Sequence, residues 1–188
     1  MEIYLVRHTT PKIKKGICYG HSDLELDDNH DEEFKVVKSK IPTLESFKII
    51  SSPLKRCALL AKQFSNDVVF DSRLKELHFG DWEMKPWNDI PEKDLTPWMS
   101  DFVTVSVPKG ESYTQLASRV TALFEEILFS ETAENLIIIS HAGPIRAFLS
   151  TLLKIDLKDS FNIKINYGDV FHIKKEVDTF NLITAINI

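Results

Sequence analysis

The sequence predicts an α/β protein, a three-layer α/β/α sandwich with a mostly parallel central sheet. Short apolar runs of strand length alternate along the chain with segments of helical periodicity, which is the order expected when helices cover a sheet. The run Leu136-Ile137-Ile138-Ile139 is apolar without alternation. Such a run is typical of a central parallel strand that is covered on both faces.

Length and composition are those of one globular domain. The chain has 188 residues, 43% of them hydrophobic and 27% charged, so it can bury a sizeable core. We therefore expect a single domain over residues 1–188. The net charge of −5 argues against nucleic acid or an anionic membrane surface as a partner. No stretch approaches the ~18–20 apolar residues that a membrane span needs.

The cysteines and the N-terminal stretch favour a cytoplasmic protein. Cys18 and Cys57 form no CxxC motif and no dense framework, so we expect reduced thiols. The apolar run after Met1 is interrupted by Arg7 and is too short for a secretory signal. No feature of the sequence predicts an oligomeric state.

The first half of the chain divides into alternating elements. The second helix has a clear start signal, with Ser52 as the expected N-cap and Pro53 at the first helical position. Glycines and polar side chains mark the long stretch after the first strand as a loop. We expect strands over residues 2–7, 47–51 and 68–70, a loop over 9–30, and helices over 31–40 and 53–64.

The second half begins with an unusual segment. Residues 72–112 are rich in proline and tryptophan without a clear period, which predicts an irregular lid or insertion rather than disorder. The strongest helical pattern of the chain follows it. We expect helices over 112–129 and from Pro144 to about Leu153, a strand over 136–140, and a terminal strand pair over 169–175 and 179–187.

Three segments share one arrangement: an apolar strand, then polar residues, then a proline near a turn or helix start. Ligands of open α/β sheets bind beyond the carboxyl ends of the strands, and helix N-termini bring free amides and a positive dipole end there. If these strands are parallel neighbours, their polar residues form an anion pocket suited to phosphate. The segments are Arg7-His8-Thr9-Thr10-Pro11, Ser51-Ser52-Pro53 and Ser140-His141-Ala142-Gly143-Pro144, with Arg56 in the helix after the second.

These residue types suit phosphoryl transfer through a covalent intermediate. A neutral His8 can attack phosphorus, and nearby cations keep a histidine neutral by lowering its pKa. Arg7, Arg56 and His141 would share the charge on the phosphoryl oxygens. Glu76 is the candidate acid that protonates the leaving alcohol, with Glu83 as the nearby alternative. Cations favour the carboxylate and burial favours the acid, so the protonation state of Glu76 before substrate binds stays open.

Four blocks in this order resemble the histidine phosphatase superfamily, the phosphoglycerate-mutase-like group. The resemblance spans nearly the whole chain and implies the phosphoglycerate-mutase-like fold. It implies His8 as phosphoacceptor, Arg7, Arg56 and His141 as phosphoryl-binding groups, Glu76 as acid and base, and neither metal nor other cofactor. The blocks are Arg7-His8-Thr9, Ser51-Ser52-Pro53-Leu54-Lys55-Arg56, Leu74-Lys75-Glu76-Leu77-His78-Phe79-Gly80-Asp81-Trp82-Glu83 and Ser140-His141-Ala142-Gly143-Pro144-Ile145-Arg146.

Within this superfamily, residues 5–11 and 16–24 are similar to α-ribazole phosphatases of cobalamin synthesis. Those enzymes release phosphate from α-ribazole 5′-phosphate or its cobalamin-bound form. The resemblance implies a substrate loop that includes Thr9, Tyr19, Gly20 and His21. The chain departs from the family at Thr9 and at Met84, where many members carry glycine. The second departure bears on the conformation of the lid.

Three functions remain open at this level. The first is a phosphomonoesterase that acts on a small phosphorylated metabolite, with α-ribazole 5′-phosphate as the first substrate to test. The second is a mutase, or a phosphatase of broad specificity. Residues 84–112 hold only Lys85, Lys93 and Lys109 as basic residues, which favours hydrolysis over phosphoryl return to a second hydroxyl. The third is a module that binds phosphorylated partners without turnover, which the presence of both a nucleophile and an acid disfavours.

Overall fold

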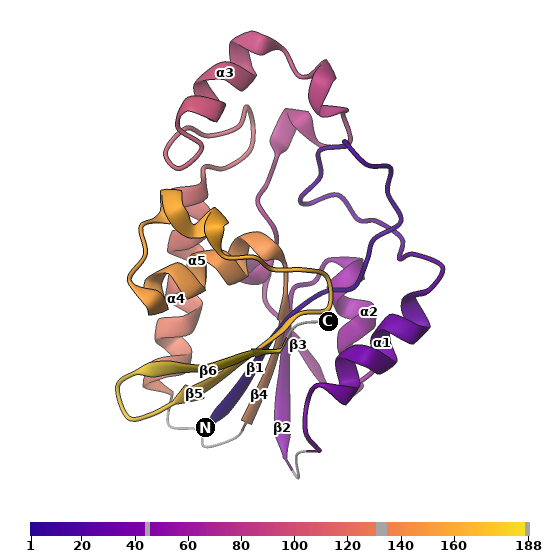
Figure 1. The fold of residues 1–188 in the computed structure, drawn as a ribbon, viewed down its shortest axis with the longest axis vertical. Coiled ribbons are helices and arrows are strands. Elements are labelled where there is room, and N and C mark those ends of the chain that lie inside the picture. Colours follow the sequence, from indigo (N-terminus) through magenta and orange to yellow (C-terminus); the bar gives the residue numbers. More distant parts are fainter. Residues whose placement is uncertain (44–45, 131–134, 187–188) are drawn as a thin grey trace.

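The computed structural model describes residues 1–43, 46–130 and 135–186. Its core is a six-stranded sheet in the order β3-β2-β4-β1-β5-β6 (Figure 1). β5 runs antiparallel to both of its neighbours, and the pairs β1–β4, β2–β4 and β2–β3 are parallel. The strands are β1 (Glu2–Arg7), β2 (Phe47–Ser51), β3 (Val68–Phe70), β4 (Asn135–Ser140), β5 (Val170–Lys175) and β6 (Phe180–Ile186).

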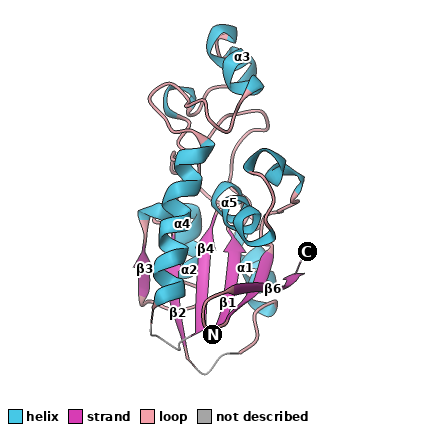
Figure 2. Cartoon of the chain, turned by 90° about the vertical axis from the view of Figure 1, so that its left-hand side faces the viewer, coloured by secondary structure: helices cyan, strands magenta, loops and turns pink. Residues whose placement is uncertain are grey.

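Helices cover both faces of the sheet, as predicted for a three-layer sandwich (Figure 2). The strand period of two divides the apolar side chains between the faces. Ile3 and Leu5 of β1 pack on the side of α4 (Tyr113–Phe129) and α5 (Ala142–Leu153). Tyr4 and Val6 pack on the side of α1 (His30–Ser39) and α2 (Lys55–Ala61).

The central strand explains the unbroken apolar run of the sequence. Leu136 and Ile138 of β4 join the cluster under α4 and α5, whereas Ile137 and Ile139 join the cluster under α1 and α2. A strand with helices over both faces needs apolar residues at every position. The predicted fold class is therefore confirmed.

The predicted helix starts differ from the observed ones at two places. Ser52 and Pro53 precede α2 instead of capping it, because Leu54 is extended (ψ 136°) and serves as the N-cap. α5 begins at Ala142, before Pro144. In α4 the expected start is confirmed, and Ser112 forms a capping box with Gln115.

The stretch 72–112 is not irregular throughout, which corrects the prediction. It contains α3 (Glu92–Ser100) and short 3₁₀ turns at Ser72–Leu74, Gly80–Trp82 and Trp87–Asp89. Pro97 lies inside α3, so proline density is a poor guide to the absence of a helix here. Figure 1 shows α3 beyond the carboxyl ends of β1 and β4.

Two further features complete the architecture. A 3₁₀ segment that the sequence does not predict, η4 (Leu157–Asn162), follows α5. The terminal strand pair β5–β6 is confirmed within the described residues, and residue 187 of the predicted second strand lies outside them. In the described part of the chain, no helix combines the length and the apolar character needed to cross a membrane.

Candidate active site

The ends of β2, β4 and β1 lie next to one another, as the sequence predicts. Arg7 pairs with Ser140 in the parallel register of β1 and β4. The His8 amide donates to the Ser140 carbonyl at 3.0 Å, and the Ser52 amide donates to the Ile139 carbonyl at 2.9 Å. The polar residues that follow these strands are therefore brought to one edge of the sheet.

His8 is held as a neutral imidazole. It is 2% exposed, and its Nδ1 lies 2.7 Å from the carbonyl oxygen of Thr9. Because a carbonyl only accepts, Nδ1 carries the hydrogen and Nε2 carries the lone pair. The Nε of Arg56 points at this lone pair from 3.3 Å. Burial, and then Arg56 and Arg7, hold the pKa of His8 well below its usual value.

His141 lies beside His8 and is fully buried. The two ring centroids are 4.9 Å apart, edge to face. Nε2 of His141 is 2.8 Å from the Ser52 hydroxyl and 3.4 Å from Sγ of Cys57. Burial, and then Arg56 and His8, keep the pKa of His141 well below its usual value, so this ring is also neutral.

The two predicted arginines are held by main-chain carbonyls. Nη1 of Arg7 donates to Ile165 at 2.8 Å, and its guanidinium lies 3.8 Å from the ring centre of Tyr167. Nε of Arg7 is buried without a partner among the described residues. Arg56 is fully buried and donates to the carbonyls of Ser22 at 2.9 Å and Gly20 at 2.6 Å.

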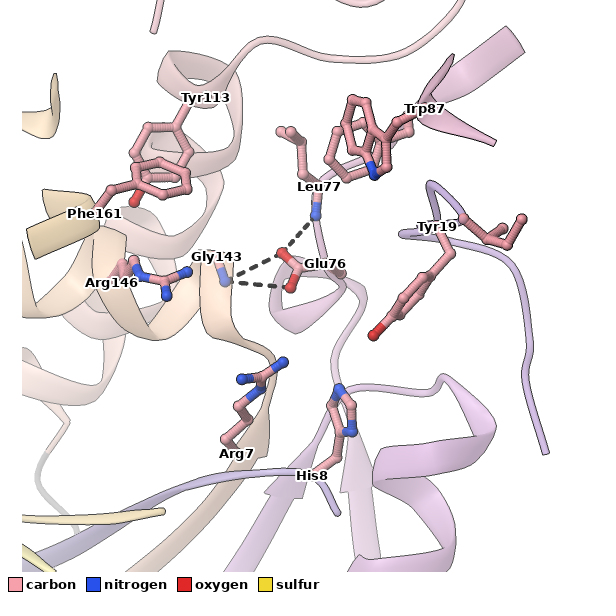
Figure 3. A pocket seen from close by; sticks show the side chains of 12 residues that line it. Arg7, His8, Tyr19, Glu76, Leu77, Trp87, Tyr113, Gly143, Arg146 and Phe161 are labelled. Carbon is pink, nitrogen blue, oxygen red and sulfur yellow. Dashed lines mark hydrogen bonds between the residues drawn. The ribbon is translucent and has the colours of Figure 1, made fainter. Parts of the chain in front are cut away.

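The carboxylate of Glu76 lies against the first turn of α5. Its Oε1 accepts from the amide of Leu77 at 2.8 Å, and both oxygens accept from the amide of Gly143 at 3.2 Å (Figure 3). A helix N-terminus offers free amides and a positive dipole end, which suits a carboxylate. This contact anchors the predicted acid above His8 and Arg7 (Figure 3).

A cavity of about 210 Å³ opens over these groups. Its walls combine two arginines and a carboxylate with many aromatic and apolar side chains. The lining residues are Arg7, His8, Ile17, Tyr19, Glu76, Leu77, Phe79, Trp87, Tyr113, Gly143, Arg146 and Phe161. Arg56 and His141 are not among them, and each contacts His8. Within the described ranges 1–43, 46–130 and 135–186, no cluster of three histidine, cysteine or acidic side chains could hold a metal ion.

The four residues of the predicted substrate loop have different surroundings. Tyr19 lines the cavity, and its hydroxyl lies 2.7 Å from that of Tyr167. Thr9 and Gly20 hold His8 and Arg56 through their carbonyls. The ring of His21 stacks on that of His78 with centroids 4.4 Å apart, and His21 does not line the cavity.

Glu83, the alternative acid, is fully engaged in holding the loop. It accepts from the amides of Gly20, His21 and Ser22 at 2.8 to 3.1 Å, and from the Ser22 hydroxyl at 2.6 Å. Although burial opposes it, these hydrogen bonds lower the pKa of Glu83 below its ordinary value. The carboxylate that faces the cavity is Glu76.

The sequence model of the histidine phosphatase superfamily (branch 1) matches residues 3–187. The chain belongs to this superfamily. Among curated relatives, phosphoserine phosphatase 1 of Hydrogenobacter thermophilus is 26% identical, covering 100% of this chain and 92% of that protein. Adenosylcobalamin/alpha-ribazole phosphatase of Salmonella typhimurium is 23% identical, covering 89% and 87%.

A solved structure confirms the fold of this member of the superfamily. The crystal structure of the alpha-ribazole phosphatase from Shigella flexneri superposes with a TM-score of 0.86, at 20% identity. The match covers 97% of this chain and 94% of that one. The predicted resemblance to the superfamily is thus confirmed along almost the full chain.

Part of the cavity wall is not predicted from the sequence. Arg146 stands in the same block as His141, yet the sequence pattern alone assigns it no role. Phe161 lies in the unpredicted η4, and Tyr113 and Trp87 come from the region predicted to be a lid or to begin a helix. Of these, only Arg146 has a signal in the sequence, because it follows Gly143 by one helical turn and shares its face.

Proposed function

We propose that the protein is a phosphomonoester hydrolase that acts through a phosphohistidine on His8. The observation that supports this most is the pairing of His8 with Thr9 and Arg56, which holds a neutral imidazole with its lone pair on Nε2, next to a cation that can bind phosphate. Histidine phosphatases act on phosphorylated small molecules, and the cavity above His8 is of a size for such a ligand.

In the first step, Nε2 of His8 attacks phosphorus in line and the bond between phosphorus and the ester oxygen breaks. Glu76 gives a proton to that oxygen, so the leaving group departs as an alcohol. The hydrogen bond of Arg56 Nε passes from the lone pair of His8 to a phosphoryl oxygen. Arg7 and His141 stabilise the remaining charge.

In the second step, water attacks the phosphohistidine and the bond between nitrogen and phosphorus breaks. Glu76 accepts a proton from this water, which restores the acid for the next cycle. Inorganic phosphate leaves and His8 returns to its neutral form. The low pKa of His8 favours this return, because the buried site disfavours an imidazolium.

We propose α-ribazole 5′-phosphate as the substrate, in the assembly of the cobalamin nucleotide loop. The cavity wall supports a leaving group with a flat apolar ring system, since Tyr19, Phe79, Trp87 and Phe161 line it. Phosphoserine is the second candidate substrate, because one of the relatives is named a phosphoserine phosphatase. Its ammonium group would find only Glu76 as a carboxylate on the wall.

A mutase is less well supported by the cavity. Returning the phosphoryl group to a second hydroxyl requires the acceptor product to stay bound, which calls for several cationic side chains around it. The lining residues include two cations, Arg7 and Arg146. The lysines of residues 84–112 are not among the lining residues.

The test is a comparison of kcat/KM for α-ribazole 5′-phosphate, phosphoserine and 3-phosphoglycerate. We expect α-ribazole 5′-phosphate to lead by at least about tenfold, the factor that about 1.4 kcal/mol of differential binding provides. Equal values of kcat/KM on the three esters would contradict the proposed substrate and indicate a phosphatase of broad specificity. Formation of 2-phosphoglycerate from 3-phosphoglycerate would support the mutase instead.

A further inference from the structure

Arg146 enters the cavity from α5, one turn after Gly143, and is half-buried. Its Nε donates to the carbonyl of Ile163 at 3.1 Å. No hydrogen bond or ion pair joins its Nη1 or Nη2 to another described residue. The terminal fork of this guanidinium therefore offers free donors to the cavity.

Three other packed arginines are fully paired at their terminal nitrogens, whereas Arg7, the phosphoryl-binding candidate, shares with Arg146 a guanidinium that lines the cavity and is incompletely paired among the described residues. Arg56, Arg73 and Arg119 each place both terminal nitrogens on oxygen acceptors of the chain. Removing a cation from water costs free energy when no hydrogen-bond acceptor replaces the water. Binding of a ligand that supplies such an acceptor is therefore favoured. Burial lowers the pKa of Arg146, against the opposing effect of Glu76, which agrees with an incompletely compensated charge.

The fork is held in a fixed orientation. The guanidinium carbon lies 5.0 Å from the ring centre of Phe161, which packs on Phe102 and Tyr113. The Tyr113 hydroxyl is occupied by Ser160 at 3.0 Å. The hydrogen bond of Nε and the contact with the Phe161 ring together fix the orientation of the guanidinium. Its Nη1 and Nη2 are then neighbouring donors, a geometry that matches two neighbouring oxygens.

Figure 3 shows Arg146 beside the Gly143–Glu76 contact, between Arg7 and the rings of Tyr113 and Phe161. We propose that Arg146 is the specificity-determining residue for the leaving group and binds a pair of neighbouring oxygens on it. Such a pair occurs in the vicinal hydroxyls of a pentose and in a carboxylate. This inference rests on the proposed function, since it needs the phosphoryl group at His8 and the ester oxygen at Glu76.

The experiment uses two matched substrate pairs. Adenosine 5′-monophosphate and its 2′,3′-dideoxy analogue differ in the vicinal hydroxyls. O-phosphoserine and O-phosphoethanolamine differ in the carboxylate. The values of kcat/KM are measured for the wild-type protein, Arg146→Met and Arg146→Lys. Lys158→Met serves as the control, because it removes an exposed positive charge of η4 that does not line the cavity.

We expect the wild-type protein to prefer the oxygen-bearing member of one pair by about 10- to 100-fold, as charge-assisted hydrogen bonds allow. In Arg146→Met this ratio falls to within about twofold, whereas Lys158→Met keeps it. Arg146→Lys keeps the charge without the fork and retains an intermediate ratio. The ratio compares two substrates on one variant, so a smaller folded fraction cancels. If Arg146→Met loses the preference within the first pair, the group that Arg146 binds is the vicinal diol. If it loses the preference within the second pair, that group is the carboxylate.

Three results overturn the inference while the proposed function stands. One is an equal loss of kcat/KM on all four esters in Arg146→Met, which would place Arg146 on the phosphoryl group. The second is an unchanged ratio in Arg146→Met. The third is no turnover of the four esters by a wild-type protein that forms a phosphoenzyme from p-nitrophenyl phosphate. Absence of that phosphoenzyme would overturn the proposed function itself, and the inference with it.

Discussion

The amide of Gly143 donates to both carboxylate oxygens of Glu76 at 3.2 Å, and only a glycine leaves room for this contact. A Cβ at position 143 would lie 2.1 Å from Oε1 of Glu76 and 3.2 Å from Cδ1 of Leu116. Glycine costs about 1 kcal/mol relative to alanine inside a helix, so this residue serves the carboxylate rather than the helix.

Gly143→Ala is therefore expected to displace Glu76 and to slow the step that needs its proton. We expect kcat/KM to fall by about 10- to 100-fold for an alkyl phosphate, in line with the cost of a ~1 Å misplacement. For p-nitrophenyl phosphate, whose leaving group departs without a proton, the loss should be much smaller. Steady-state kinetics on both esters check this, with Glu76→Gln as the reference variant. An equal loss on both esters would argue against an acid role for Glu76.

Glu83→Ala is expected to release residues 20–22, because the Glu83 carboxylate accepts the amides of all three residues. We expect a loss of about 2–4 kcal/mol in unfolding free energy, since hydrogen bonds to a charged, half-buried group are worth more than neutral ones. KM should rise, because Arg56 and Tyr19 depend on this loop.

Urea unfolding and limited proteolysis measure the effect. Glu125→Ala, which removes an exposed carboxylate of α4, is the matched control and should change stability by less than about 0.5 kcal/mol. A Glu83→Ala protein as stable as this control would show that the loop is held by other contacts.

The two buried histidines predict a loss of stability in acid. Burial and nearby arginines lower the pKa of His8 and His141 in the folded state, so the unfolded chain binds protons first. Their contribution is complete above the unfolded pKa of about 6.5 and is lost as the pH falls from there toward the folded pKa values.

Unfolding free energies at about pH 7.5 and about pH 5.5 measure this, and we expect a decrease on the order of 1 kcal/mol per histidine. The decrease should be smaller in His141→Asn. A His141→Asn protein with the same pH dependence as the wild type would show that the pKa of His141 is the same in the folded and unfolded states.

Met84 occupies a left-handed backbone conformation, with φ 65°, at a position where the resemblance to the family predicts glycine. Its amide donates to the Cys18 carbonyl at 2.8 Å, so the backbone keeps a glycine-type turn with a side chain on it. Met84→Gly should stabilise the protein by up to about 1 kcal/mol, because relief of strain outweighs the added entropy of the unfolded chain.

Met99→Gly is the matched control, because Met99 is an exposed residue of α3 in an ordinary helix. Met99→Gly should lower the free energy of unfolding by about 1 kcal/mol, because glycine is unfavourable in a helix. Thermal and urea unfolding distinguish the two variants. Equal destabilisation by both substitutions would mean that Met84 carries no strain.

The parts of the site that follow strands can be predicted from the sequence. The Arg7-His8, Ser51-Ser52 and Ser140-His141 steps each interrupt an apolar run, and parallel register brings such steps together. The wall of the cavity cannot be predicted in this way. Phe161 lines the cavity from a 3₁₀ segment, and Tyr167 packs on Arg7 from a turn. In such segments neither a period of two nor a period of 3.6 marks which side chain faces inward.

The long segment 72–112 departs from its prediction for a related reason. Its prolines suggest a lack of helix, yet α3 contains Pro97 and begins directly after Pro91. Its tryptophans pack on one another across turns, with Trp82 and Trp98 centroids 5.5 Å apart. Packing of this kind depends on tertiary contacts that local propensity does not contain.

Covalent phosphorylation of His8 is the most direct test of the proposed mechanism. The protein is incubated with a ³²P-labelled phosphomonoester, quenched in alkali and mapped by mass spectrometry. We expect alkali-stable, acid-labile phosphate on His8, its absence together with loss of activity in His8→Ala, and its presence in the surface control His30→Ala. Full activity of His8→Ala, or the same label on that variant, would contradict nucleophilic catalysis by His8.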